Sequence, residues 1–302
     1  MRVLISGASG FIGKSLTARL LERGDEVVHL VRREPESDSE AIQIRWDTTD
    51  PDSVNVDDLG AVDAVFNFSG ATVAKRWTRN YLDVISSSRI ITTKTLVEII
   101  RRMEAPPNVL ITASGVAFYG DRDDEQLTEQ SERGEGILAD IAVPWEAATA
   151  SAEEFGVRTA TARFGMVFAA DDGPLPVLAR PFRTGLGGRL GNGRQWTPWI
   201  HIDDAISALI FVAENESLNG PINVVSPGVV RNSEISQAIA DALHKPCFGW
   251  MPAIIAKFVI GNYIQELAID SKFVIPEKLL QASFEFKYRD LRACLEHELS
   301  TN

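Results

Sequence analysis

Three glycines near the N-terminus have the spacing of a dinucleotide-binding turn. They stand between an apolar run at residues 2–6 and a segment, 15–24, whose apolar residues recur at helical spacing. In such a unit the first glycine permits a tight turn, the second admits a pyrophosphate and the third permits close helix packing. The alternative is a turn whose glycines serve only backbone geometry. The residues expected to contact the dinucleotide here are Gly7, Ser9, Gly10, Phe11, Ile12 and Gly13.

The end of the next apolar run indicates which dinucleotide is bound. The run at 25–33 ends in Arg32 and Arg33, where a carboxylate would bind the ribose hydroxyls of NAD. Because a guanidinium pairs with a 2′-phosphate, the sequence predicts NADP(H), with Arg32 at that phosphate. Alternatively, Arg32 is a solvated surface residue. Asp47, which ends the run at 41–47, is expected either at the adenine amino group or in an ordinary turn.

The order of apolar runs and helical stretches predicts an α/β fold. Because strands that alternate with helices form a parallel sheet, we expect a Rossmann-like, doubly wound sheet in residues 1–225, with a loop-rich insertion at about 173–198. Residues 226–302 are expected to form a small, mostly helical lobe on the substrate side. Strands are expected at 2–6, 25–33, 41–47, 61–70, 108–115 and 156–168, and helices near 79–103 and 141–155, the latter starting close to Pro144.

Composition and charge restrict the classes of partner. The 302 residues are 45% hydrophobic, and their net charge of −12 disfavours a nucleic-acid surface, which needs clustered Lys and Arg. Because the sequence has neither a membrane-length apolar run nor a signal peptide, we expect a cytoplasmic protein without membrane partners. The four histidines and two cysteines lack the spacing of metal ligands. We therefore expect no metal, and we expect Cys247 and Cys294 to be packing residues.

Several motifs resemble those of extended short-chain dehydrogenases/reductases, which include the sugar-nucleotide epimerases and dehydratases. These are GASGFIG (7–13), SGVAFYGD (114–121) and PWIHIDDA (198–205). More narrowly, the whole chain resembles the atypical "epimerase family protein" subgroup. The motifs that carry this narrower resemblance are RWT (76–78), SSSR (86–89), GNGRQWTPWIHIDD (191–204), GPINVVSP (220–227) and IPEKLLQASFEFKY (275–288).

The resemblance implies an NADP-bound Rossmann domain with a helical C-terminal extension and a small-molecule substrate that is obscure even within the subgroup. It adds Ser69, Gly70 and Arg89 to the expected cofactor contacts, and Arg89 falls near a helix position where typical members carry a structural Asn. Relatives with this fold often pair through two helices. The resemblance therefore also implies a homodimer formed through 79–103 and 141–155.

The resemblance breaks down at the acid/base pair. Typical extended members combine a Ser or Thr after the fifth strand with a Tyr-xxx-Lys pair on the next helix, in which the lysine lowers the tyrosine pKa. Ser114 matches the serine, but Ala142 and Glu146 stand at the tyrosine and lysine positions, and the chain contains no YxxxK. Glu146 is a candidate base, partly desolvated beside Trp145; alternatively, it pairs with an arginine such as Arg89.

Other residues near the expected site also have two interpretations each. Tyr119 is a candidate proton donor that faces the nicotinamide, or an aromatic ring packed over the cofactor. Arg163 and Arg194 shape the substrate pocket or form structural ion pairs. His201 is catalytic, or it is buried with a backbone partner, and one of the two aspartates at 203–204 is expected to cap the following helix.

Two functions follow from these residues. The first is an oxidoreductase or epimerase-like enzyme in which Ser114 polarises a carbonyl or hydroxyl and Glu146 or Tyr119 moves the proton. The second is a non-catalytic NADP(H)-binding redox sensor or regulatory protein. An open cleft with converging polar groups favours the enzyme, and a plugged cleft with a large outer apolar patch favours the sensor. Binding of nucleic acid or a sugar nucleotide in a basic groove has weaker support.

Overall fold

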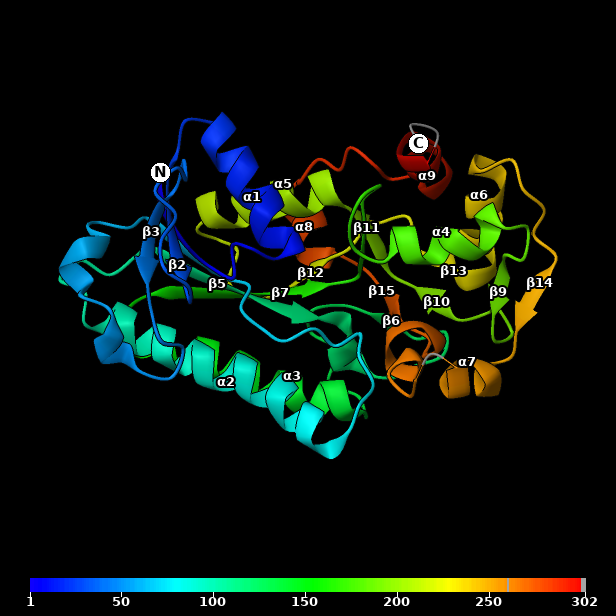
Figure 1. The fold of residues 1–302 in the computed structure, drawn as a ribbon, viewed down its shortest axis with the longest axis horizontal. Coiled ribbons are helices and arrows are strands. Elements are labelled where there is room, and N and C mark those ends of the chain that lie inside the picture. The colour runs from blue at the N-terminus through cyan, green and yellow to red at the C-terminus, as the bar shows by residue number, and fades with distance from the viewer. Residues whose placement is uncertain (260, 300–302) are drawn as a thin grey trace.

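The computed structural model describes residues 1–259 and 261–299, and a seven-stranded parallel sheet forms its centre (Figure 1). The strand order is β12-β7-β5-β4-β1-β2-β3, so the order reverses at β1 and β4 as in a doubly wound Rossmann sheet. This confirms the predicted fold class. The strands are β1 (Arg2–Ser6), β2 (Glu26–Val31), β3 (Ile42–Arg45), β4 (Ala64–Asn67), β5 (Val109–Gly115), β7 (Arg158–Phe164) and β12 (Gly220–Val224).

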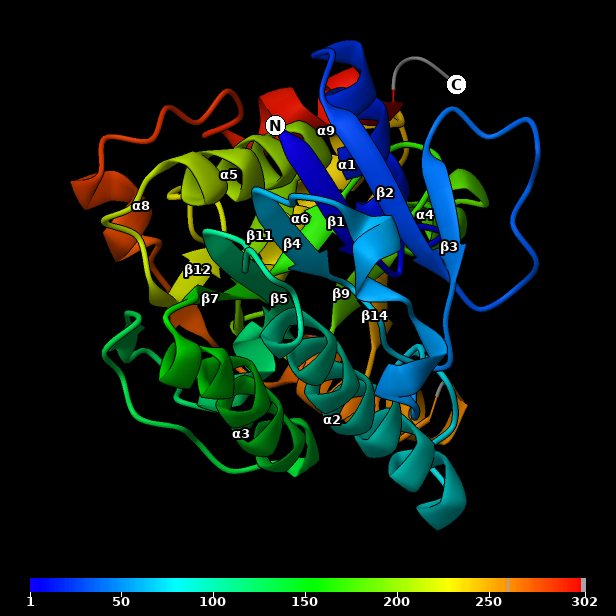
Figure 2. The same cartoon turned by 90° about the vertical axis from the view of Figure 1, so that its left-hand side faces the viewer.

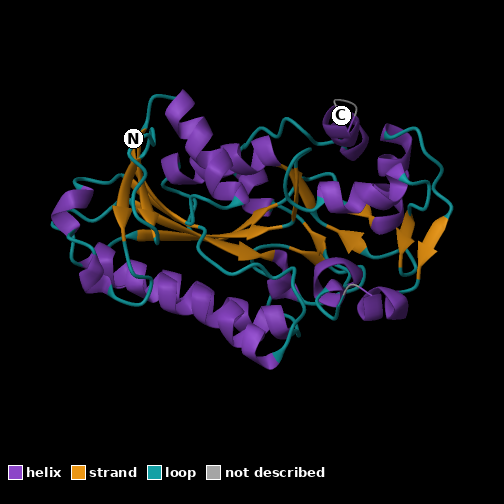
Figure 3. Ribbon diagram, in the orientation of Figure 1, coloured by secondary structure: helices purple, strands orange, loops and turns teal. Residues whose placement is uncertain are grey.

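Helices cover both faces of the sheet (Figures 2 and 3). The helices α1 (Phe11–Glu22) and α5 (Ile202–Glu214) lie on one face, and α2 (Arg79–Arg101) and α3 (Ile137–Ala150) lie on the other. Because successive side chains of a strand point to opposite faces, β1 contributes to both cores. Its Val3 and Ile5 pack with α1 and α5, whereas Leu4 packs with α2. Burial on both faces explains the continuous apolar runs of these strands.

Two predicted elements have different bounds in the structure. The helix expected at 141–155 begins earlier, at Ile137, and therefore encloses Pro144. The strand expected at 156–168 divides into β7 and β8 (Met166–Phe168) at Gly165. A Cβ at Gly165 would lie 2.6 Å from the Pro198 carbonyl oxygen, so β8 leaves the large sheet where another segment crosses it closely. There β8 pairs with β11 (Trp199–His201).

The expected C-terminal lobe is present, and its core also includes part of the segment predicted to be loop-rich. Within 173–198, α4 (Leu175–Arg183) packs against α6 (Asn232–Ala242) and α9 (Leu291–Leu299). Cys294 is buried in this core and Cys247 packs against it. The remaining strands are β6 (Gln126–Leu127), β9 (Gly188–Leu190), β10 (Trp196–Thr197), β13 (Val230–Arg231), β14 (Gly249–Met251) and β15 (Phe273–Val274). The remaining helices are α7 (Ala253–Val259) and α8 (Glu277–Gln281), and short 3-10 or π turns lie at 51–53, 56–59, 116–119, 151–155 and 265–269.

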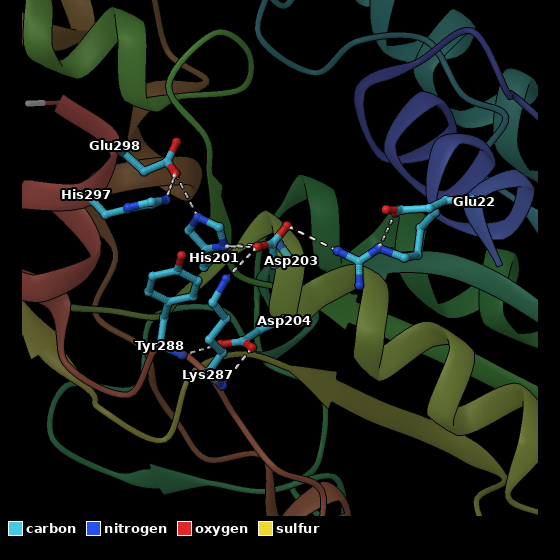
Figure 4. A network of polar contacts seen from close by, with 9 residues as sticks. Glu22, His201, Asp203, Asp204, Lys287, Tyr288, His297 and Glu298 are labelled. Atoms are coloured by element: carbon cyan, nitrogen blue, oxygen red, sulfur yellow. Dashed lines mark hydrogen bonds and ion pairs between the residues drawn. The ribbon is translucent and has the colours of Figure 1, made fainter. Parts of the chain in front are cut away.

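A polar network connects α9 to the start of α5 (Figure 4). The ring of His201 caps α5, because its Nδ1 accepts the Asp203 N–H at 3.0 Å. Its Nε2 therefore carries the proton and donates to Glu298 at 2.8 Å. The predicted aspartate cap is wrong: Asp204 instead accepts the backbone N–H groups of residues 287 and 288. His201 is thus a buried structural residue with a backbone partner, the second of the two expected interpretations.

Among the helices within 1–259 and 261–299, none combines the length and apolarity needed to cross a bilayer. The same residues contain no group of three or more His, Cys, Asp or Glu side chains arranged to hold a metal ion.

Candidate functional site

The glycine turn between β1 and α1 has the geometry that pyrophosphate binding requires. Gly7 has a φ of +79°, and a Cβ there would lie 2.6 Å from the Phe68 carbonyl carbon. A Cβ on Gly13 would lie 2.5 Å from the Gly7 oxygen, so the fold itself needs these two glycines. A Cβ on Gly10 would meet only that same oxygen, at 3.4 Å. Gly10 therefore leaves open space for a ligand.

The start of α1 is free to bind an anion. Gly10 is its N-cap and supplies no side-chain cap, no side chain within residues 1–259 and 261–299 accepts from its first-turn N–H groups, and the first turn has no acidic residue. Unpaired N–H groups and the helix dipole together favour a phosphate at such a position. The turn residues and helix start thus fit the predicted dinucleotide.

A shallow pocket lies at the carboxyl ends of β2 and β3, and it is lined in part by Arg32 and Asp47. Arg32 is exposed and available to a ligand, whereas Arg45 in the same pocket pairs with Glu34. Asp47 accepts the hydroxyl and the N–H of Thr49, at 2.7 and 2.8 Å, and these bonds lower its pKa. Asp47 is therefore a turn aspartate, as the alternative interpretation stated, that also faces the pocket.

A cavity of about 310 Å³ lies on the other side of the glycine turn, at the carboxyl ends of β4, β5 and β7. Four of the expected site residues line it, namely Ser69, Gly70, Arg89 and Ser114. Most of its other lining side chains are apolar. The cavity is closed on the side of the lobe by polar residues that the sequence did not single out, and these are Glu266, Asp270 and Lys272.

A buried hydrogen-bonded chain lies behind Ser114. The Ser114 hydroxyl donates to Glu146 Oε1 at 2.6 Å, and Arg163 donates to both carboxylate oxygens of Glu146, at 2.9 and 2.7 Å. Arg163 also donates to the Tyr119 hydroxyl at 2.9 Å, which in turn donates to Asn223. Of these residues only Ser114 lines the cavity. These hydrogen bonds direct the Ser114 hydroxyl proton toward Glu146 and leave the lone pairs of the Ser114 oxygen available to a ligand in the cavity.

The network differs from several expectations. Glu146 pairs with Arg163 and not with Arg89, and both Glu146 and Tyr119 lie outside the cavity lining. Tyr119 is fully buried, and burial raises its pKa, so it holds its proton within the core. The cause is the 3-10 turn at 116–119, which directs the ring into a cluster with residues such as Leu127 and Val274. Arg163 forms the structural ion pair that was one of its two interpretations.

Arg89, which falls near the helix position where typical extended members carry a structural Asn, lines the cavity. Its guanidinium lies over the Trp145 ring, with 5.0 Å between the Cζ atom and the ring centroid, and donates to the carbonyls of Ala71 and Ile85. Burial lowers its pKa to about 10. Arg194 is exposed and is not part of the cavity lining.

Glu266 anchors the lobe to α3. Its carboxylate accepts the N–H groups of Ile137 and Leu138, at 2.9 and 2.8 Å, and so caps a helix that follows a glycine. These partners are 129 and 128 residues away in the chain, which is why no local pattern revealed the cap. Lys272 Nζ then donates to the Glu266 carbonyl at 2.9 Å.

We expect Glu266→Ala to lower the free energy of unfolding by about 1 to 2 kcal/mol, because it removes a carboxylate cap from α3. Urea unfolding, followed by circular dichroism, measures this loss. Glu296→Ala, at an exposed position of α9, is the control and should change stability by less than about 0.5 kcal/mol. Equal stability of the two variants would mean that the cap does not hold the helix.

An uncapped helix start with one pocket on each side, along the carboxyl edge of a parallel sheet, defines a Rossmann-type dinucleotide-binding protein. Residues 3–225 match the NAD dependent epimerase/dehydratase family, and residues 251–298 match a domain of unknown function (DUF1731). The chain belongs to the NAD dependent epimerase/dehydratase family, which binds nicotinamide cofactors. This confirms the resemblance found in the motifs.

Known relatives agree with this assignment over the whole chain. The epimerase family protein SSP1921 of Staphylococcus saprophyticus is 33% identical over 300 residues, which cover 97% of each chain. The crystal structure of human epimerase family protein SDR39U1 (isoform 2) with NADPH has a TM-score of 0.89 and 29% identity, and covers both chains fully. A nucleoside-diphosphate sugar epimerase from Corynebacterium glutamicum has a TM-score of 0.82 and 33% identity, and this chain spans 59% of its length.

Proposed function

We propose that this protein is an NADP(H)-dependent oxidoreductase or epimerase-like enzyme that acts on a small carbonyl or hydroxyl compound. The observation that carries the proposal is the linear order of sites along the sheet edge. Ser114 lies at the carboxyl end of β5, the glycine turn follows β1 and Arg32 follows β2, in the order β5-β4-β1-β2. The three strand spacings amount to about 14 Å, with the glycine turn two spacings from β5 and one from β2, an arrangement suited to a dinucleotide whose pyrophosphate lies between the two pockets.

Arg32 supports NADP(H) over NAD(H). The end of β2 offers an exposed guanidinium and no carboxylate for two ribose hydroxyls. The human structure with a TM-score of 0.89 contains NADPH, which supports the same assignment.

Ser114 is suited to hold the substrate. The cofactor would supply or accept a hydride at the cavity. Because the Ser114 proton is donated to Glu146, the Ser114 oxygen is set to accept a hydrogen bond from a substrate hydroxyl. Glu146 and Arg163 act behind it as positioning residues.

We expect Arg32→Ala to weaken NADPH binding about 10- to 100-fold and to leave NADH binding nearly unchanged, because only NADPH has the 2′-phosphate. Calorimetric titration with both dinucleotides measures the change in preference. The neighbouring Arg33→Ala is the matched control, since Arg33 is also exposed but does not line the pocket. A preference that Arg32→Ala leaves unaltered would reject the assignment of NADP(H).

A second candidate, a non-catalytic NADP(H)-binding sensor, is supported by a different observation. Large apolar side chains around β14 and α7 are highly exposed, including Phe248 at 89%, Ile254 at 82% and Phe258 at 92%. The cavity lined by Ser114 favours the enzyme. The sensor would be favoured if the protein retained NADPH and reduced none of a panel of aldehydes, ketones and quinones.

A homodimer through α2 and α3 stays a prediction. Apolar side chains on both helices are exposed, among them Val84 and Ile91 on α2 and Val143 on α3. Burying such side chains would favour association of two copies.

A further inference from the structure

One lysine of the lobe, Lys272, lines the cavity, most of whose other lining side chains are apolar. Lys272 lies directly before β15, and its side chain is 5% exposed. Its backbone N–H donates to the Trp196 carbonyl at 3.1 Å, which fixes the residue against another cavity-lining segment. No motif or spacing in the sequence marks Lys272 as a site residue.

The ammonium group of Lys272 has unused donors. Within the described residues, its only hydrogen bond goes to the Glu266 carbonyl, and the nearest Asp270 carboxylate oxygen is 3.9 Å from Nζ, too far for a hydrogen bond. An ammonium carries three N–H groups. Two of them therefore remain for a ligand in the cavity.

The surrounding charges set how readily Lys272 gives up its proton. Asp270 and Glu266 from the lobe and Asp121 from the loop after β5 act on it electrostatically and favour its charged form. Arg89 is the other cation that lines the cavity. Burial outweighs the three carboxylates and lowers the Lys272 pKa, while burial also raises the pKa of Asp270. Because its pKa is lowered, the buried ammonium gives up its proton more readily than a solvated lysine does.

The residues behind Ser114 do not supply this proton. The Ser114 proton is donated to Glu146, whose carboxylate is held by Arg163, and Tyr119 is sealed in the core. The Tyr-xxx-Lys pair is absent from the chain. A reduction in this cavity therefore needs a proton from another element.

We propose that Lys272 is the catalytic residue that exchanges a proton with the substrate oxygen, in place of the missing tyrosine. The inference rests on the proposed function. In the reducing direction the carbonyl carbon gains the hydride that the reduced nicotinamide supplies, and the electron pair of the C=O bond moves to oxygen. That oxygen takes a proton from the Lys272 ammonium and becomes a hydroxyl. The neutral amine then regains a proton from water.

The first test is independent of turnover. Reductive methylation with ¹³C-formaldehyde labels lysine amines, and the pH titration of each NMR signal gives its pKa; Lys272→Arg identifies the Lys272 signal by its loss. We expect the Lys272 signal to titrate below the ordinary range of a lysine, because burial lowers its pKa. An Lys272 amine that remains unlabelled, or that titrates with the surface lysines, would overturn the proposal.

The second test uses 2,3-butanedione and NADPH as the carbonyl probe and hydride donor. We expect Lys272→Met to lower kcat about 100-fold while calorimetry shows unchanged NADPH affinity. Lys272→Arg should be equally slow, because arginine keeps the charge but does not release a proton. Rescue by arginine would reduce Lys272 to a charge-binding role and overturn the proposal. If the wild-type protein does not reduce the probe, the proposed function fails, while the titration still decides the state of Lys272.

Discussion

Gly10→Asp should abolish dinucleotide binding while leaving the protein as stable as before or slightly more stable. Gly10 occupies the N-cap position of α1 but has no side chain to cap the helix, and aspartate is among the best residues at such a position. Its carboxylate also interacts favourably with the helix dipole, so we expect a gain of about 0.5 kcal/mol. The same carboxylate would occupy the space left for the pyrophosphate and repel it, and NADPH affinity should fall at least about 100-fold.

Gly10→Asn separates charge from size in this experiment. Asparagine caps the helix equally well but carries no charge, so stability should rise similarly and affinity should fall less. Thermal unfolding of the ligand-free protein and calorimetric titration with NADPH give the two quantities. If Gly10→Asp bound NADPH as tightly as the wild type, the pyrophosphate would have to lie elsewhere.

Arg163→Met should cost about 3 kcal/mol of stability and misplace Ser114. Arg163 is 3% exposed and is the partner of both Glu146 oxygens, so its loss leaves a poorly solvated carboxylate without its cation. It also removes the donor to the Tyr119 hydroxyl. Denaturant unfolding measures the loss of stability.

A double-mutant cycle tests whether Arg163 and Glu146 form one unit. Glu146→Gln removes the charge that Arg163→Met leaves unpaired, so the double variant should be more stable than Arg163→Met alone. Additive losses in the cycle would show that the two side chains act independently, contrary to the observed ion pair.

The sequence predicted the parts of the fold and site that depend on local pattern. The spacing of Gly7, Gly10 and Gly13 and the apolar runs around them are sufficient to predict the β1–α1 turn, because its backbone geometry tolerates few alternatives. Ser114 was found because it matches the serine position of the extended short-chain dehydrogenases/reductases, in the motif at the carboxyl end of β5.

The missed features depend on residues far apart in the chain. Glu146 lies 17 residues from Arg163, and their pairing required α3 and β7 to be placed side by side. The early start of α3 depends on Glu266, which no pattern near residue 137 indicates. Lys272 looks like an ordinary surface lysine until the lobe is folded over the cavity.

The most direct test of this account is the structure of the protein crystallised with NADPH. We expect the pyrophosphate against the N–H groups at the start of α1, the 2′-phosphate beside Arg32 and the nicotinamide in the cavity lined by Ser114 and Lys272. A dinucleotide bound away from the glycine turn, or a nicotinamide outside this cavity, would contradict the account.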